Sequence, residues 1–210
     1  ERNSMPKLPL PEGLDTPDLE CVMINVPTLD IQRAAGDLWD EDALFYGDIP
    51  KLKYAQGAVA EENAHLTLLF GLHPSNSYEA SVLMALDGWD LPDILINEVK
   101  YFPSRVEGQN YICLYAEVVK SAGLLAGRAR LEELPYSDEF DEYKPHISLV
   151  YLKTDTGVDT QAWIDALNSA FAHQFSAGEK TWLDLGLDDE DRDVEVVAQH
   201  LGRSLRHVLE

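Results

Sequence analysis

A six-residue segment that occurs twice places the strongest constraint on how this chain can fold. Residues 65–70 read His-Leu-Thr-Leu-Leu-Phe, and residues 146–151 read His-Ile-Ser-Leu-Val-Tyr. The six positions match identically or conservatively, and both copies carry the β-branched and aromatic residues that are typical of strands. The repeat therefore predicts two equivalent β-strands within one molecule.

Side-chain alternation then decides which residues of each copy share a face. Residues i and i+2 of a strand point to the same side, so His65 projects together with Thr67, and His146 together with Ser148. The apolar residues between them point to the other side and are predicted to be core. By the same alternation, Tyr151 points away from the His146 face. If the two strands lie side by side, two imidazoles and two hydroxyls surround one cleft.

The three-letter pattern His-x-Ser/Thr is weak evidence when taken alone. A chain of this composition contains about half a match by chance, and a lone strand histidine is usually structural. A third match, at residues 73–75, lies at a strand end before a helix and lacks the matching context, so we expect it to be structural. The functional interpretation therefore depends on the matched context of the two full copies.

The hydrophobic periodicity around the repeat predicts a mixed order of strands and helices. Strands are expected at residues 21–26, 65–72, 94–102, 111–119, 146–152 and 181–187. Helices are expected after the N-caps Thr28, Ser77 and Ser121, and near residues 160–175. Because the strands come in hairpin-like pairs, we predict an α+β fold rather than a doubly wound one.

The chain is expected to have one main domain and two flanking segments. Residues 1–18 form an extended Pro-rich arm, whose first four residues are either a vector remnant or the seam of a larger polypeptide. Residues 19–187 form the domain, which includes a long irregular connection over 40–63. Residues 188–210 form an acidic loop and an amphipathic C-terminal helix. The apolar stripe of that helix requires a surface in its own domain, in a second copy or in a neighbouring domain.

The charge balance limits the classes of molecule that this chain is expected to bind. Thirty-eight Asp and Glu residues against sixteen Lys and Arg residues give a net charge of −22. This charge argues against long duplex nucleic acid, which is bound through phosphate neutralisation, but a local group of donors can still hold a small phosphate. No apolar run approaches the roughly 20 residues of a membrane-spanning helix. Cys21 and Cys113 lie in apolar stretches and are predicted to be reduced, buried thiols, and no signal peptide opens the chain, so we expect a cytoplasmic protein.

Two histidines and two hydroxyls are sufficient for phosphodiester cleavage. One imidazole removes a proton from the attacking oxygen, the other delivers a proton to the leaving oxygen, and the hydroxyls of Thr67 and Ser148 donate to the phosphoryl oxygens. Histidine titrates at about pH 6.5, so both protonation states are accessible near neutrality. This chemistry requires neither metal nor cofactor. The sequence leaves open which of His65 and His146 is the base.

The paired motifs resemble those of the 2H phosphoesterase superfamily, which is named for its two His-x-Thr/Ser motifs. The stretch Tyr143-Lys144-Pro145-His146-Ile147-Ser148 is similar to the second motif of its bacteriophage and bacterial members. The resemblance implies a bilobal α+β fold, with two pseudo-symmetric lobes, mostly antiparallel sheets around a central cleft, and helices outside. It also implies catalytic roles for His65 and His146, and phosphate-holding roles for Thr67 and Ser148.

The resemblance further implies a substrate with a 2′,3′-cyclic phosphate, a 2′–5′ linkage or another phosphodiester linkage such as that of a cyclic oligonucleotide. Relatives include RNA ligase-like 2′–5′ enzymes, cyclic phosphodiesterases and phage enzymes of immune evasion that destroy cyclic-nucleotide signals. The net charge favours a small nucleotide, and a phage-encoded protein would act in the bacterial host cytoplasm. A second hypothesis is a catalytically idle phage or multidomain module that binds a protein partner.

Several other side chains have two interpretations. Tyr143 and Lys144 either contact the substrate, by stacking on a base and steadying a phosphate, or are an edge-packing residue and a solvated ammonium. Aromatic residues in the long connection, namely Phe45, Tyr46 and Tyr54, either form a base-stacking lid or anchor the loop. The remaining histidines of the C-terminal part, namely His173, His200 and His207, form no recognisable metal-ligand set.

Overall fold

The computed structural model describes residues 19–26, 29–45, 64–73, 75, 78–104, 108, 110–137, 140, 142–172, 175–176 and 183–184. The predicted Pro-rich arm, most of the 40–63 connection and the segment 188–210 lie outside these residues. So do Thr28 and Ser77, two of the three expected N-caps, and the histidines at 173, 200 and 207.

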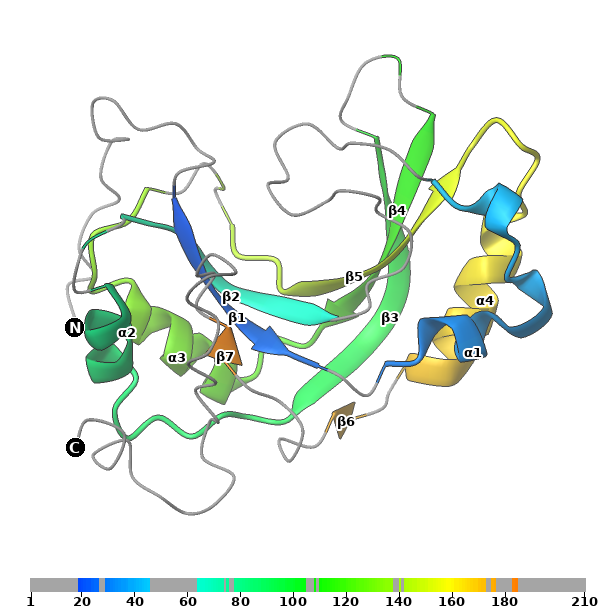
Figure 1. Cartoon of the computed structure of the whole chain (residues 1–210). Coiled ribbons are helices and arrows are strands. Elements are labelled where there is room, and N and C mark those ends of the chain that lie inside the picture. Colours follow the sequence, from blue (N-terminus) through cyan, green and yellow to red (C-terminus); the bar gives the residue numbers. More distant parts are fainter. Residues whose placement is uncertain are drawn as a thin grey trace.

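A seven-stranded sheet forms the centre of the molecule, and its strand order is β6-β3-β4-β5-β2-β1-β7 (Figure 1). Its strands are β1 (Glu20–Asn25), β2 (His65–Leu72), β3 (Ile94–Pro103), β4 (Tyr111–Val118), β5 (His146–Lys153), β6 (Phe175–Ser176) and β7 (Leu183–Asp184). All neighbouring strands pair antiparallel. The α+β prediction is therefore confirmed, because neighbouring described strands all pair antiparallel and none forms a parallel pair joined by a crossover helix.

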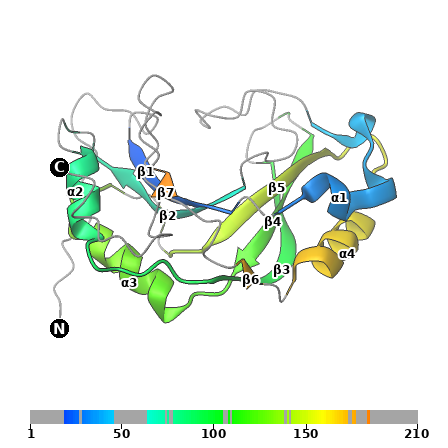
Figure 2. The ribbon, with the colours of Figure 1, turned by 60° about the horizontal axis from the view of Figure 1, so that its bottom comes forward.

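The helices lie at the two ends of the bent sheet. They are α1 (Ile31–Ala35), α2 (Tyr78–Ala85), α3 (Ala122–Leu131) and α4 (Thr160–Phe171), with 3-10 turns at Gly36–Leu38 and Glu41–Ala43. Figures 1 and 2 show α2 and α3 beside the half that contains β1 and β2, and α1 with α4 beside β3. Helix α3 contacts β2, and α4 contacts both β3 and α1. Each end of the sheet is thus covered by its own pair of helices.

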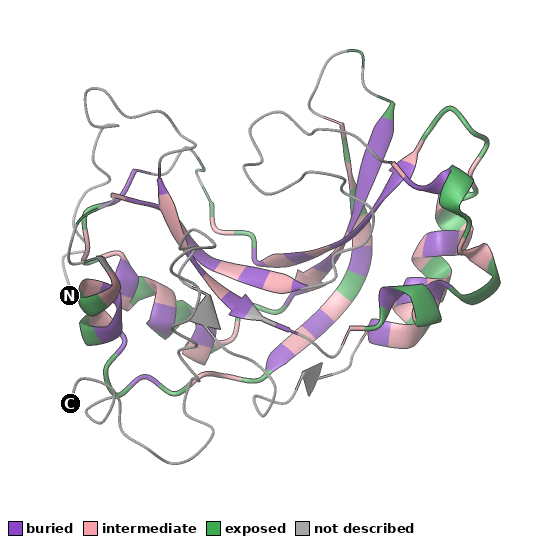
Figure 3. Ribbon diagram, in the orientation of Figure 1, coloured by how far each residue is buried: buried purple, intermediate pink, exposed green. Residues whose placement is uncertain are grey.

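One continuous apolar core lies between the helices and the sheet. Its sheet side includes Leu66 of β2 and Ile147 of β5, both fully buried, and its helix side includes Leu124 of α3 and Trp163 of α4. Along most strands the buried residues alternate with more exposed ones (Figure 3). This pattern is expected when only one face of a sheet is packed against helices.

The two halves of the sheet are related by the internal repeat. In the β1–β2 pair, Met23 lies opposite Thr67 and Cys21 opposite Phe70, so Leu68 between them has no partner. The β4–β5 pair repeats this register with Tyr115 opposite Ser148 and Cys113 opposite Tyr151, which leaves Leu149 without a partner. Each copy of the six-residue segment therefore carries a β-bulge at its fourth residue. The repeated residues occupy equivalent positions in two structurally equivalent strand pairs.

Two helix boundaries differ from the predictions. Helix α1 is capped by Asp30, whose carboxylate accepts the backbone N–H of Arg33 at 3.0 Å, rather than by Thr28. Helix α4 ends at Phe171 instead of residue 175, because residues 175–176 form β6 and pair with β3. The Ser121 cap of α3 is confirmed, since its hydroxyl accepts the N–H of Leu124 at 3.2 Å.

Two further observations bear on the sequence predictions. Cys113 is buried, as expected, but Cys21 is only half-buried, and the two residues do not form a disulfide. Among the described helices, none has the length and apolar character required to cross a membrane.

Candidate functional site

The two predicted motif strands are neighbours at the centre of the sheet. Leu66 of β2 pairs directly with Ile147 of β5 in antiparallel register. This register places His65 across from Ser148 on the facing strand. It also places Thr67 across from His146. The middle residues of both motifs thus meet at the junction of the two equivalent halves.

All four predicted site residues share the face opposite the helices. Leu66 and Ile147 are 0% exposed on the core side, so their sequence neighbours His65, Thr67, His146 and Ser148, which are all half-buried, project to the other side. The two histidines are diagonal neighbours across the strand pair, a relation in which residues lie about 7–8 Å apart. The structure thus brings two imidazoles and two hydroxyls into one small area.

The ring of His146 is held in a defined tautomer. Its Nδ1 lies 2.8 Å from the backbone carbonyl oxygen of Lys144. Because a carbonyl oxygen can only accept, Nδ1 carries the hydrogen and Nε2 carries the lone pair of the neutral ring. The rings of Phe102 and Tyr115 contact His146 edge-on, with centroid distances of 5.3 and 5.5 Å, and they stack on each other at 3.8 Å.

Tyr143 and Lys144 hold the second motif in place. The Tyr143 hydroxyl donates to the backbone carbonyl of Thr67 at 3.1 Å, and the Arg128 guanidinium lies 4.3 Å from the centre of its ring. Burial raises the pKa of Tyr143, and the Arg128 charge opposes this only in part. These contacts correspond to the edge-packing interpretation of Tyr143. Lys144 has an exposed side chain, and its carbonyl orients the His146 ring.

The bulge at Leu149 corrects one sequence prediction. Strict alternation predicts that Tyr151 faces away from His146, but the extra residue reverses the alternation after Ser148. Tyr151 is therefore on the same side as His146 and lies opposite Cys113. It is nevertheless buried, because it packs there in a second cluster with Tyr111 and Cys113.

Phe45 covers this second cluster. Its ring lies 4.6 Å from that of Tyr111, and its backbone N–H donates to the Tyr151 carbonyl at 2.9 Å. For Phe45, these contacts correspond to the loop-anchoring interpretation. Tyr46 and Tyr54 lie outside the described residues.

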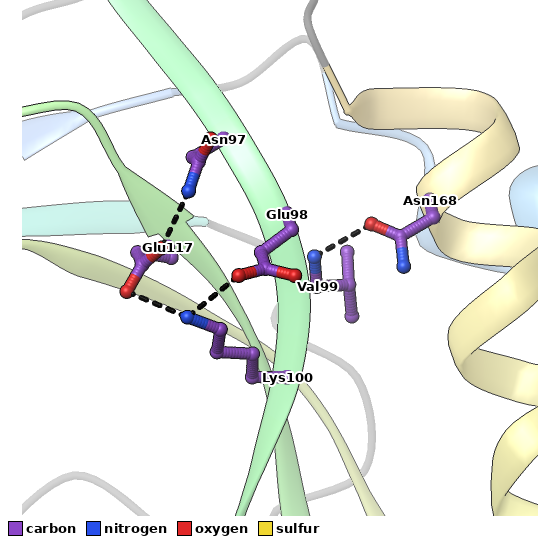
Figure 4. A network of polar contacts seen from close by, with 6 residues as sticks. All are labelled: Asn97, Glu98, Val99, Lys100, Glu117 and Asn168. Carbon is purple, nitrogen blue, oxygen red and sulfur yellow. Dashed lines mark hydrogen bonds and ion pairs between the residues drawn. The ribbon is translucent and has the colours of Figure 1, made fainter.

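A polar network around Glu117, whose position on β4 is opposite His146, was not anticipated from the sequence (Figure 4). Glu117 accepts hydrogen bonds from the Asn97 amide at 2.7 Å and from the Lys100 ammonium at 2.9 Å, and Lys100 also contacts Glu98 at 2.7 Å. The hydrogen bond from Asn97 contributes most to lowering the pKa of Glu117, and the hydrogen bond from Lys100 lowers it further. The contacts with Glu98 and Glu117 raise the pKa of Lys100. Charged residues at alternate positions of otherwise apolar strands were the available sequence signal.

The third His-x-Ser match begins at His73, directly after β2 and at the opposite end of that strand from His65. Nε2 of His73 is 2.8 Å from the hydroxyl oxygen of Ser137. The backbone N–H of His73 donates to the backbone carbonyl of Pro135 at 3.0 Å. Both contacts join the end of β2 to the segment after α3, which agrees with the predicted structural role. Within the described ranges, no group of three or more His, Cys, Asp or Glu residues is arranged to hold a metal ion.

Comparison with known proteins finds only distant similarity. No family model matches the chain, and no curated protein matches it. A solved structure of Usb1 from Kluyveromyces marxianus is similar with a TM-score of 0.44 and 9% identity, covering 81% of this chain and 95% of that chain. A structure of the same protein with uridine monophosphate has a TM-score of 0.44 and 10% identity, covering 82% and 96%. A likeness this distant assigns neither a family nor an activity, so the function has to be argued from the geometry of the site.

Proposed function

We propose that this protein is a metal-independent phosphodiesterase of the 2H type that acts on a small nucleotide. The observation that carries the proposal is the pairing of Leu66 with Ile147. This pairing gathers His65, Thr67, His146 and Ser148 on the face of the sheet opposite the described helices. These four side chains are the set that acid–base cleavage of a phosphodiester needs.

The proposed reaction uses one imidazole as base and the other as acid. The base takes the proton of the attacking hydroxyl or water as the new P–O bond forms, and the acid protonates the oxygen of the breaking P–O bond. The hydroxyls of Thr67 and Ser148 donate to the non-bridging oxygens. Each well-placed proton transfer contributes about 10²–10⁴-fold to the rate. The Nδ1 contact of His146 supports this scheme, because it directs Nε2 to the proton transfer.

A small nucleotide is the substrate class that the charge and the surroundings favour. The net charge of −22 repels a long polyanion. The stacked rings of Phe102 and Tyr115 stand next to His146 and offer apolar area to a base. With the 2H resemblance, these features favour a 2′,3′-cyclic phosphate, a 2′–5′ linkage or a cyclic oligonucleotide signal, acted on in the cytoplasm of a bacterial cell or of a phage-infected host.

The test is a substrate panel measured with EDTA present. It contains 2′,3′-cyclic AMP, a 2′–5′-linked diadenylate, and cyclic di- and trinucleotides. We expect cleavage that survives EDTA, has a bell-shaped pH profile, and falls at least about 100-fold in His65→Ala and in His146→Ala. His73→Ala is the matched control, because it removes a histidine of the same three-letter pattern that contacts Ser137 instead.

Two outcomes would contradict the proposal. Activity that requires added metal, or that neither His65→Ala nor His146→Ala reduces, would remove the two-histidine mechanism. Absence of cleavage across the panel by folded protein would favour the other hypothesis, an idle module that binds a protein partner.

A further inference from the structure

We propose that Arg128 and Tyr143 act together as positioning residues that hold Thr67 of the first motif against the second motif. The proposal rests on the proposed phosphodiesterase function and deepens it, because it names the contacts that fix the two motif strands relative to each other. Its starting point is the short pairing between β2 and β5.

The two motif strands are joined by little regular pairing. Within the described part of the chain, Leu66 of β2 and Ile147 of β5 form the one registered residue pair between them. Extending this register by two positions puts Leu68 opposite Pro145, which precedes β5 and has no N–H. Regular pairing therefore contributes little to fixing Thr67 relative to β5, and other contacts have to supply this.

Two side chains bind the backbone of β2 just beyond the registered pair. The Tyr143 hydroxyl donates to the carbonyl oxygen of Thr67 at 3.1 Å, and Nη1 of Arg128 donates to that of Leu68 at 3.3 Å. Leu68 is the bulge residue without a partner on β1, and a bulge locally interrupts the ladder. The two side chains thus bind the two peptide groups that follow Thr67, where the ladder constrains the backbone least.

The same two side chains also hold each other. The Arg128 guanidinium lies over the Tyr143 ring, 4.3 Å from its centre, which is a cation–π distance. Its Nε donates to Glu132, one turn further along α3, at 2.8 Å, and its side chain is only 11% exposed. Because a guanidinium is planar and has donors in fixed directions, it can bind Glu132 and Leu68 while it lies over the ring. We call this pair, Arg128 and Tyr143, the brace.

The brace connects the two motifs across the junction of the two halves. Tyr143 lies three residues before His146 in the sequence, so its bond to Thr67 joins the second motif to the first. The orientation of the peptide group after Thr67 determines where the side chain of Thr67 points. In the proposed reaction the Thr67 hydroxyl donates to a phosphoryl oxygen, and a misplacement of about 1 Å can cost about 100-fold in rate. Loss of the brace is therefore expected to slow the reaction by displacing this hydroxyl.

A purely structural role would have a different effect. If Arg128 and Tyr143 only stabilised the fold, their loss would reduce the fraction of folded protein. The kcat/KM of the folded molecules would then stay unchanged. All variants are therefore assayed under conditions in which urea unfolding shows them to be folded.

The first experiment is a double-mutant cycle on 2′,3′-cyclic AMP, or on the member of the substrate panel that is cleaved fastest. Tyr143→Phe removes the hydroxyl and keeps the ring beside Arg128. We expect it to lower kcat/KM about 10-fold in the wild type but less than about 2-fold in a Thr67→Val background, because the hydroxyl that it positions is already absent there. No loss in the wild type, or equal losses in both backgrounds, would overturn the proposal.

Ser121→Ala is the control for a general loss of stability. It removes the cap of helix α3, whose hydroxyl accepts the N–H of Leu124, and so destabilises the same helix from its other end. We expect it to change kcat/KM by less than about 2-fold. A loss as large as that of Tyr143→Phe would show that destabilising α3 is sufficient, and would contradict a specific role for the brace.

The second experiment compares two arginines of α3. Arg128→Lys keeps the charge but loses the planar fork that reaches Glu132 and Leu68. Arg130→Lys is the matched control, because Nη1 of Arg130 donates to the carbonyl of Asp87 and not to β2. We expect Arg128→Lys to lower kcat/KM at least about 5-fold and Arg130→Lys less than about 2-fold. Equal effects would overturn the part of Arg128.

NMR of the backbone gives a measurement that does not depend on activity. We expect Tyr143→Phe to shift the signals of the peptide group between Thr67 and Leu68 more than those of any other peptide group of β2. Ser121→Ala should leave these signals in place. Unchanged signals of Thr67 and Leu68 in Tyr143→Phe would contradict the contact on which the brace depends.

These measurements separate the inference from the proposed function. If folded wild-type protein cleaves no member of the panel, the proposed function fails, and NMR still decides whether Tyr143 fixes the backbone at Thr67. If cleavage depends on both motif histidines but Tyr143→Phe and Arg128→Lys retain the wild-type kcat/KM, the function stands and the positioning role is wrong.

Discussion

Replacing Gly71 by alanine should destabilise the protein far more than the same change at another glycine with positive φ. Gly71 lies in β2 with a φ of +94°, and no residue of β1 pairs with it, so it forms the second bulge of that strand. A Cβ atom added there would lie 1.8 Å from the carbonyl oxygen of Ser137. Because this oxygen belongs to the backbone, the segment after α3 has to move away.

The cost can be estimated from the contacts that this movement breaks. A positive φ costs a residue with a side chain about 1–2 kcal/mol. The shift also breaks the hydrogen bond from Ser137 N–H to the Gly71 carbonyl, 2.8 Å long. Loss of such a bond with its groups left buried costs about 1–3 kcal/mol. The sum is about 2–5 kcal/mol, a large part of the 5–15 kcal/mol by which domains are typically stable.

Gly88→Ala is the matched control. Gly88 has a φ of +67°, and nothing lies within 4 Å of an added Cβ there, so only the backbone cost applies. Equilibrium urea unfolding of both variants at pH 7 gives the two free energies of unfolding. We expect Gly71→Ala to lose about 2 kcal/mol more than Gly88→Ala. Equal losses would refute the argument from the Ser137 contact.

Two further predictions concern the contacts that support the site. Asn168→Ala on α4 removes the acceptor of the Val99 N–H, a bond of 2.7 Å, and should cost about 1–3 kcal/mol in urea unfolding. Gln161→Ala on the same helix, whose amide contacts only an exposed carboxylate, should change stability by less than about 0.5 kcal/mol. Burial raises the pKa of Tyr143 in the folded protein, so its contribution to stability is complete below the unfolded pKa of about 10 and declines as the pH rises above it. Tyr143→Phe should therefore lose about 0.5–1.5 kcal/mol at pH 7, through the missing hydrogen bond, and less at pH 10.5; an equal loss at both pH values would contradict this reasoning.

The positions of most elements could be predicted from local sequence. Strand β2 was predicted with its observed bounds, and β3, β4 and β5 to within one residue, because apolar, β-branched and aromatic runs interrupted by Pro, Gly and Asn define them. Helix α3 was found from its serine cap and its apolar spacing. The errors, at α1 and at the end of α4, lie where several residues can cap a helix or where a short strand pairs with a distant partner.

The bulges show what local sequence does not contain. Leu68 and Leu149 look like ordinary strand residues, yet each lacks a partner because the neighbouring strand is one residue shorter at that point. The face on which Tyr151 lies follows from this mismatch. A bulge depends on the register of two strands that are far apart in sequence, so a single strand does not reveal it.

By itself, the sequence determined the residue types of the candidate site, because the repeat names two histidines and two hydroxyls and their alternation puts each pair on one side of its strand. Only the tertiary structure decided that the two pairs meet, through the register of Leu66 with Ile147. It also decided that Glu117 lies opposite His146. The physical reason is that alternation is set by the geometry of one chain segment, whereas register is set by the packing of the whole core and by long-range backbone hydrogen bonds.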